Sequence, residues 1–339
     1  MNMSESNWNK VEFQDFINDF GIEIIIKNAP VILFSKQDKE KEAKYSLYIF
    51  LVLFGSLVIF LAVSIGMSLY FYSDILGLSL VILIALSISS IFFLINYSLS
   101  NFYIKPIECW VEIFRTIYPN NQNYYCFIYY PVFSGKCHPN EAINIIYKLY
   151  QEEVYGTTID ITKIEVYLKL DKIDHYKNEK MGFFFRYAGG SSFKSENIQE
   201  CVWKFFPFKK SLEENYIAIG NWAHYYEWRF DLALDYDKLE SYSPWLIKKW
   251  DKTNLKPLTN DFKYKIKWKK KFEDLEPHII PEQIKNNEDI SLKPKMDNDM
   301  EIVKNAIKIL IGEEIKVNNN KDIREKLFEF RAFFRDLNH

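Results

Sequence analysis

The sequence predicts an α+β membrane protein in which a two-helix transmembrane hairpin is joined to a cytoplasmic, antiparallel β-rich domain with peripheral helices. Two apolar segments, 45–73 and 75–104, predict the hairpin, since neither carries a charged residue and each exceeds the ~20 residues that cross a bilayer. Between residues 159 and 234, strand-like segments follow one another without intervening helices. That succession is typical of an antiparallel sheet or a small barrel.

Basic residues flank the two apolar segments and predict their orientation. Asp74 is the only charged residue between the segments, whereas cations lie outside them, namely Lys36, Lys39, Lys41, Lys44, Lys105 and Arg115. By the positive-inside rule, both termini would be cytoplasmic and the protein would be an integral, multi-pass membrane protein. Small residues at a spacing of four would let the two helices approach closely, and these are Ala62, Gly66, Ala85 and Ser89.

The predicted organisation has five parts. Residues 1–44 form a cytoplasmic segment packed on the C-terminal domain, 45–104 the hairpin, 105–272 the β-rich domain, 273–298 a linker and 299–339 a pair of helices. A net charge of −2 argues against a dedicated nucleic-acid binder. An aromatic content of 17% favours an ordered domain with a real core.

Local patterns predict the elements of the N-terminal half. A helix over Asn7–Phe20 would end at Gly21, and a second helix over Pro139–Tyr155 would end at Gly156. The other predicted elements are a strand over Ile22–Lys27, a helix over Pro106–Tyr118 and a buried strand over Tyr124–Phe133.

The C-terminal half is predicted from alternation and helical periodicity. Further strands are expected over Ile159–Leu170, Met181–Tyr187, Cys201–Phe208, Asn215–Gly220, Trp222–Leu234 and Phe262–Phe272. Two helices, Glu301–Gly312 and Asp322–Leu337, close the chain. The second has a narrow apolar seam suited to one partner helix, so a protein partner or self-association through these helices is a further expectation.

Motifs for phosphate and metal binding are incomplete. Ser134-Gly135-Lys136-Cys137 resembles the end of a phosphate-binding loop, but Tyr130 stands where the first glycine belongs and Cys137 replaces the Ser or Thr that would hold Mg²⁺. We therefore interpret it as a turn. Cys126, Cys137 and His138 lack the paired spacing of a zinc site. No metal and no cofactor are predicted.

His224, Glu227 and Arg229 are the candidates for catalysis, if the protein is an enzyme. Alternation along a strand would place His224 on an aromatic face and the other two on the opposite face. We therefore favour a packed, hydrogen-bonded core histidine over a catalytic base.

Alternating lysines in the predicted strand Phe262–Phe272 form a candidate contact surface for anions, namely Lys263, Lys265, Lys267 and Lys269. Lysines on an outward strand face commonly prevent aggregation through the sheet edge. They could instead contact anionic lipid or bind an anionic ligand such as a nucleotide.

Three classes of function follow from these features. The favoured class is a membrane-tethered binding or scaffold module that acts with the lipid bilayer and an unidentified ligand. The second is a ligand-gated membrane effector, because a two-span hairpin with a β-rich cytoplasmic domain resembles, in layout alone, bacterial antiphage effectors that sense cyclic nucleotides. The third is a membrane-bound enzyme with scattered active-site residues.

Overall fold

The computed structural model describes residues 8–34, 104, 106–117, 123–170, 179–189, 202–208, 216–228, 246–271, 276–285, 290–292, 298–311 and 320–337. The chain divides into two compact units, Met1–Ser35 with Lys105–His339, and Lys36–Ile104. Apart from Ile104, all described residues belong to the first of these units.

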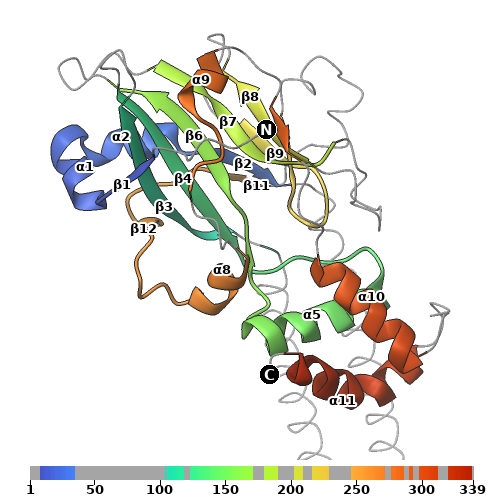
Figure 1. Ribbon diagram of the computed structural model, residues 1–339. Helices are drawn as coiled ribbons and strands as arrows, with labels where there is room; N and C mark the ends of the chain where they lie inside the picture. Colours follow the sequence, from blue (N-terminus) through green and yellow to red (C-terminus); the bar gives the residue numbers. More distant parts are fainter. Residues whose placement is uncertain are drawn as a thin grey trace, which may run out of the picture. The chain divides into compact units, whose positions relative to one another are not determined.

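One mixed sheet of thirteen strands is the main feature of the described residues (Figure 1). Its strands are β1 (Asn9–Val11), β2 (Val31–Phe34), β3 (Pro106–Ile117), β4 (Asn123–Phe133), β5 (Asp160–Ile161), β6 (Ile164–Lys169), β7 (Glu179–Tyr187), β8 (Val202–Pro207), β9 (Tyr216–Ile219), β10 (Tyr226–Trp228), β11 (Leu246–Lys248), β12 (Leu255–Pro257) and β13 (Ser291–Leu292). The helices are α1 (Phe13–Phe20), α2 (Ile22–Asn28), α5 (Glu141–Tyr155), α8 (Lys265–Lys271), α9 (Pro281–Lys285), α10 (Asn298–Ile311) and α11 (Asn320–Asp336).

The order of the strands corrects the prediction of an antiparallel sheet. Along the main path the order is β1-β3-β4-β6-β7-β10-β9-β2-β11, with β12 beside β3, β5 beside β4, and β8 between β7 and β13. The central pairs are antiparallel, but β12 runs parallel to β3, β10 to β7 and β2 to β9. Parallel neighbours need crossover connections, so the paired strands are distant in sequence. The alternation of residues along one strand does not reveal such distant partners.

Strand β3 replaces the helix that we predicted over Pro106–Tyr118. It pairs with β4 from Pro106 to Ile117, and most of its residues are buried. A strand covered on both faces loses its period of two, so its apolar residues also match a helical stripe. Two glutamates of this strand, Glu108 and Glu112, are buried and form ion pairs with Lys256 and Lys10.

Helix α2 replaces the predicted strand Ile22–Lys27. The chain turns at Gly21, which has φ 81°, and the next seven residues form a helix that buries Ile24, Ile25 and Asn28. Burial at neighbouring positions and at a spacing of four suits a helix packed on the sheet. The N-terminal segment still enters the sheet, because Val31–Phe34 pairs with β9 and β11.

Helix α8 replaces most of the predicted strand Phe262–Phe272. Lysine is a good helix former, and residues four apart share one helix face. The alternating lysines therefore divide between two faces, so that Lys265 is exposed whereas Lys267 is buried. Of the predicted strand Trp222–Leu234, the structure describes residues 222–228, where β10 is extended and the residues before it form a turn.

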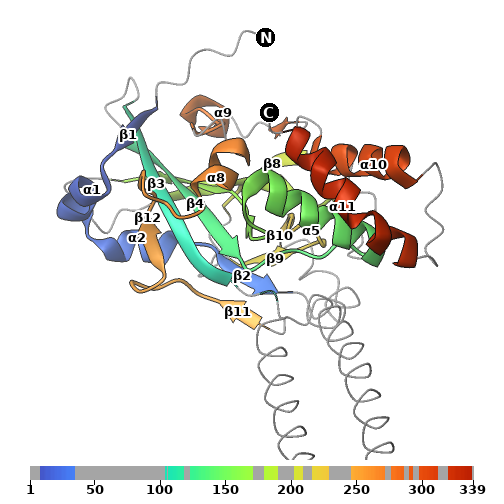
Figure 2. The same cartoon turned by 90° about the horizontal axis from the view of Figure 1, so that it is seen from below.

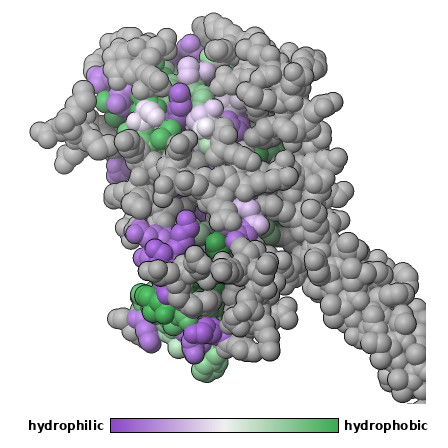
Figure 3. Space-filling view, turned by 90° about the vertical axis from the view of Figure 1, so that its right-hand side faces the viewer, coloured by the Kyte–Doolittle hydropathy of each residue, from purple (hydrophilic) through white to green (hydrophobic). Residues whose placement is uncertain are grey.

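Helices α5, α10 and α11 gather at one end of the sheet, and α1 and α2 lie at the other (Figures 1 and 2). Helix α5 ends at Tyr155 as predicted, and Gly156, with φ 67°, donates its N–H to the Glu152 carbonyl. The seam of α11 packs within the chain, with Phe334 5.3 Å from Tyr150 of α5 between ring centroids. Other apolar residues of these helices remain at the surface (Figure 3).

The prediction of a transmembrane hairpin is corrected. In the described part of the chain, every helix is too short or too polar to span a bilayer. We therefore withdraw the multi-pass membrane assignment and the cytoplasmic placement of both termini that depended on it. The predicted spans, 45–73 and 75–104, and the small residues Ala62, Gly66, Ala85 and Ser89 lie, except for Ile104, outside the described residues.

We expect Phe334→Ala to destabilise the packing of α11 on α5, because Phe334 is fully buried against Tyr150. Truncation of a buried Phe costs about 3–5 kcal/mol. Urea unfolding of the purified protein measures this cost. The control is Phe328→Ala on the same helix, where the side chain is 80% exposed and should change stability little. Equal effects of the two variants would contradict the packing of α11.

Candidate functional site

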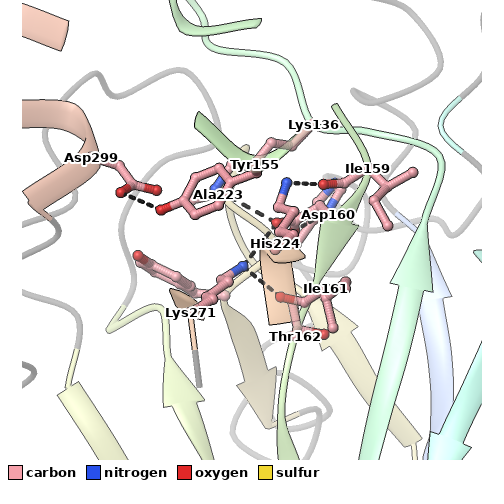
Figure 4. A network of polar contacts seen from close by, with 12 residues as sticks. Lys136, Tyr155, Ile159, Asp160, Ile161, Thr162, Ala223, His224, Lys271 and Asp299 are labelled. Carbon is pink, nitrogen blue, oxygen red and sulfur yellow. Dashed lines mark hydrogen bonds and ion pairs between the residues drawn. The ribbon is translucent and has the colours of Figure 1, made fainter. Parts of the chain in front are cut away.

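A fully buried carboxylate, Asp160, joins four separate segments of the chain (Figure 4). Its Oδ1 lies 3.0 Å from Lys271 Nζ of α8 and 3.7 Å from Lys136 Nζ of the loop after β4. Its Oδ2 lies 3.1 Å from His224 Nδ1 in the turn between β9 and β10. Asp160 itself is held in place because β5 pairs with the end of β4. We call Asp160, Lys136, His224, Lys267 and Lys271 the Asp160 cluster.

His224 reaches Asp160 from a turn with an unusual backbone. Its φ is 57°, in the left-handed region that is uncommon for residues other than glycine, although Asn, Asp and His adopt it more often than the rest. Asn221 stabilises this turn, because its side-chain oxygen accepts the N–H groups of Ala223 and Tyr225 and its carbonyl accepts the N–H of His224. The imidazole is fully buried and packs on Phe133 at 4.7 Å between ring centroids. This geometry makes His224 a support for Asp160.

Helix α8 supplies two amines because Lys267 and Lys271 are four residues apart on one face. Lys271 also donates to the Ile161 carbonyl, and its side chain is 28% exposed, so the cluster meets solvent there. Lys267 is only 1% exposed and donates to the Ile159 carbonyl. With its side-chain amide turned over, the orientation that satisfies both its oxygen and its nitrogen, Gln151 accepts from the same amine at 3.1 Å. The Tyr155 ring lies below that amine, 5.6 Å away.

The charges in the Asp160 cluster act on one another. Burial of Asp160 would by itself raise the pKa of its carboxyl, but Lys271, Lys136 and the hydrogen bond from His224 hold that pKa well below its ordinary value. Asp160 is therefore ionised. Burial lowers the pKa of Lys267 well below its ordinary value; Asp160 opposes this effect, and the nearby Lys271 and Lys136 add to it. The cluster thus combines one stable carboxylate with an amine whose charge is costly.

The predicted site residues have different positions in the structure. Of the lysines, Lys267 joins the cluster, Lys263 lies 3.8 Å from Glu108, and Lys265 and Lys269 are exposed. They do not form the single row of a strand face, because three of the four lie on helix α8, and contact of these lysines with anionic lipid stays a prediction. Glu227 is buried and packs over Gly220.

Arg229 is the third catalytic candidate, and it lies outside the described residues. Asp160 and Lys271 were not among the predicted site residues, because no local motif marks either of them. The incomplete phosphate-loop motif did contain Lys136, and the structure places this residue in a loop, as predicted.

A second buried carboxylate, Glu165, lies on β6, five residues after Asp160. Its Oε1 is 2.8 Å from Lys163 Nζ and 2.5 Å from His278 Nδ1, and its Oε2 accepts the His278 N–H and the Tyr167 hydroxyl. Burial would raise the pKa of this carboxyl, but Lys163 and His278 keep it far below its ordinary value. The predicted linker, 273–298, is thereby fastened to the sheet, and Ile279 within it is fully buried.

Other chemistry has less support in the part of the chain that the structure describes. No group of three or more His, Cys, Asp and Glu side chains there is arranged to hold a metal ion. Burial raises the pKa values of the Cys109 and Cys126 thiols, which disfavours their reactive thiolate forms.

Comparisons of the chain with protein-family models, curated proteins and solved structures found no match.

We expect Glu165→Gln to lower the free energy of unfolding by about 3–5 kcal/mol, because it leaves the buried Lys163 ammonium without its carboxylate. Chemical denaturation of both proteins measures the change. Glu301→Gln, at an exposed position on α10, is the control and should be nearly neutral. A loss below about 1 kcal/mol for Glu165→Gln would show that the ion pair is dispensable.

Acid should destabilise the protein through Asp160 and Glu165. Both carboxyls have lower pKa values in the folded protein than in the unfolded chain, where the ordinary values are about 4. Their contribution is therefore complete above about pH 4 and is lost as pH falls below it, because the unfolded chain binds more protons. Melting temperatures measured from neutral to acid pH should fall in that range. The fall in melting temperature with pH should be shallower in Glu165→Gln. An unchanged dependence of melting temperature on pH would show that Glu165 does not contribute to the acid sensitivity.

Proposed function

We propose that this chain is a ligand-binding module whose ligand carries an oxyanion group, phosphate or carboxylate, that binds at the Asp160 cluster. The observation that supports this proposal most strongly is the environment of Lys267. Its amine is almost completely buried, and its contacts are the Ile159 carbonyl, the Gln151 amide and the Tyr155 ring, all of them neutral. Lys136 and Lys271 share the carboxylate of Asp160.

A buried ammonium without a counterion is costly in an interior of low dielectric constant. An oxyanion beside Lys267 would remove that cost and would also attract Lys271, which has a partly exposed side chain. Lysine is an established ligand for phosphate, as a compact point charge. The three amines therefore supply the attraction, while Asp160 keeps them close together.

The position of His224 supports binding better than it supports catalysis. His224 is fully buried, and Asp160 occupies its Nδ1. A general base must come within hydrogen-bond distance of the proton that it removes from a substrate, and this position favours a structural role instead. Binding without chemistry agrees with the binding or scaffold module that the sequence favours, without the membrane tether.

The proposal predicts saturable binding of small oxyanions. Calorimetry and thermal unfolding would be measured with inorganic phosphate, sulfate and citrate, with chloride as the reference at equal ionic strength. A ligand at 100 times its Kd stabilises the folded protein by about 2.7 kcal/mol. Lys267→Met keeps an unbranched side chain but removes the charge, so affinity should fall by about tenfold or more, which corresponds to ~1.4 kcal/mol or more.

Lys265→Met is the matched control, because Lys265 is an exposed lysine on the same helix. This variant should bind the oxyanions as the unmodified protein does. The proposal is wrong if none of the three oxyanions binds saturably, or if the two variants lose affinity equally. The second outcome would indicate general attraction by the lysines of α8.

A further inference from the structure

We infer that the Asp160 cluster binds its anion together with a proton, which Lys267 takes up. This inference rests on the proposed function and concerns the regulation of the same site. Its basis is that Lys267 is buried among neutral contacts, whereas Lys136 and Lys271 already have a carboxylate partner.

The charged groups that act on Lys267 come from several elements of the fold. Asp160 of β5 and Asp299 of α10 favour its charged form, and Lys271 of α8 and Lys136 of the loop after β4 disfavour it. Tyr155 of α5 contacts the amine through its ring and donates its hydroxyl to Asp299 at 2.7 Å. His224 completes the set through Asp160.

These groups leave the free site close to electrical balance when Lys267 is neutral. Lys136 and Lys271 are then matched by Asp160 and Asp299. Protonation of Lys267 adds one buried cation with no carboxylate in contact, which agrees with the lowered pKa of this amine. A bound anion supplies the missing negative charge. The balanced reaction joins one amine, one proton from the solvent and one anion to form an ammonium–anion pair.

The linkage between proton and anion fixes the sign of the pH dependence. Below the pKa of Lys267 in the free protein, the amine is already charged and affinity does not change with pH through this group. Above that pKa, and up to the higher pKa in the complex, each binding event takes up a proton. Affinity should then fall by about tenfold for each unit rise in pH, because one proton is linked to one anion.

Sulfate is the best probe, because its own charge is constant over the range studied. Titration calorimetry at a single pH in two buffers of different ionisation enthalpy gives the number of protons taken up. We expect this number to rise from near zero towards one per sulfate as pH rises through the lowered pKa of Lys267 in the free protein. The control variant Lys265→Met should take up the same number of protons per sulfate as the unmodified protein. Lys267→Arg, whose guanidinium stays protonated, should bind sulfate without proton uptake.

Carbon-13 labelling of the lysine ε-carbons provides a measurement that needs no substituted protein. In the free protein, Lys267 and also Lys180, the latter with a pKa that burial lowers to about 8, should titrate at a lower pH than the exposed lysines, and saturating sulfate should move only the Lys267 titration upward. Sulfate binding with no proton uptake and no such movement would overturn the inference and leave the proposed function intact. Absence of any oxyanion binding would overturn both.

Discussion

Two buried carboxylates, Asp160 and Glu165, bring distant parts of the chain together. Asp160 and Glu165 are both inaccessible to solvent, and a carboxylate stays ionised in such a place only when cations and hydrogen-bond donors reach it. The loop after β4, the end of α8 and the turn at His224 must therefore meet at Asp160. Lys163 and the 276–285 segment must likewise meet at Glu165. Because the two acids lie five residues apart, one short stretch of chain fixes two distant parts of the fold.

Features encoded by neighbouring residues could be predicted from the sequence. The ends of α1 and α5 were predicted correctly, because Gly21 and Gly156 adopt the positive φ angles that end a helix. Strand β4 was also recognised, since its run of aromatic and β-branched residues is too short and too continuous for an amphipathic helix. In each case the chemistry that decides the structure lies within a few residues of the feature itself.

The errors have a common cause, which is that partners far along the chain decide between two local structures. The apolar residues of β3 fit a helical stripe as well as a buried strand, and pairing with β4 selects the strand. The lysines of α8 fit both a period of two and a spacing of four, and the second is realised because Lys267 and Lys271 meet acceptors on another segment. Lys271 and Asp160 are 111 residues apart, so no motif of fixed spacing could have indicated their contact.

The composition of the Asp160 cluster itself argues for a role beyond folding. A group of buried ions contributes little to stability compared with apolar side chains of similar volume, which often pack as well or better. If Asp160, Lys136 and Lys271 served only to hold α8 on the sheet, a fourth ionisable group at Lys267 would add cost without benefit, because it contacts only neutral groups. The same amine is useful if an anion enters. While the site is empty, Asp160 limits the repulsion between Lys136 and Lys271. When an oxyanion enters, protonated Lys267 would supply the positive charge that the anion neutralises.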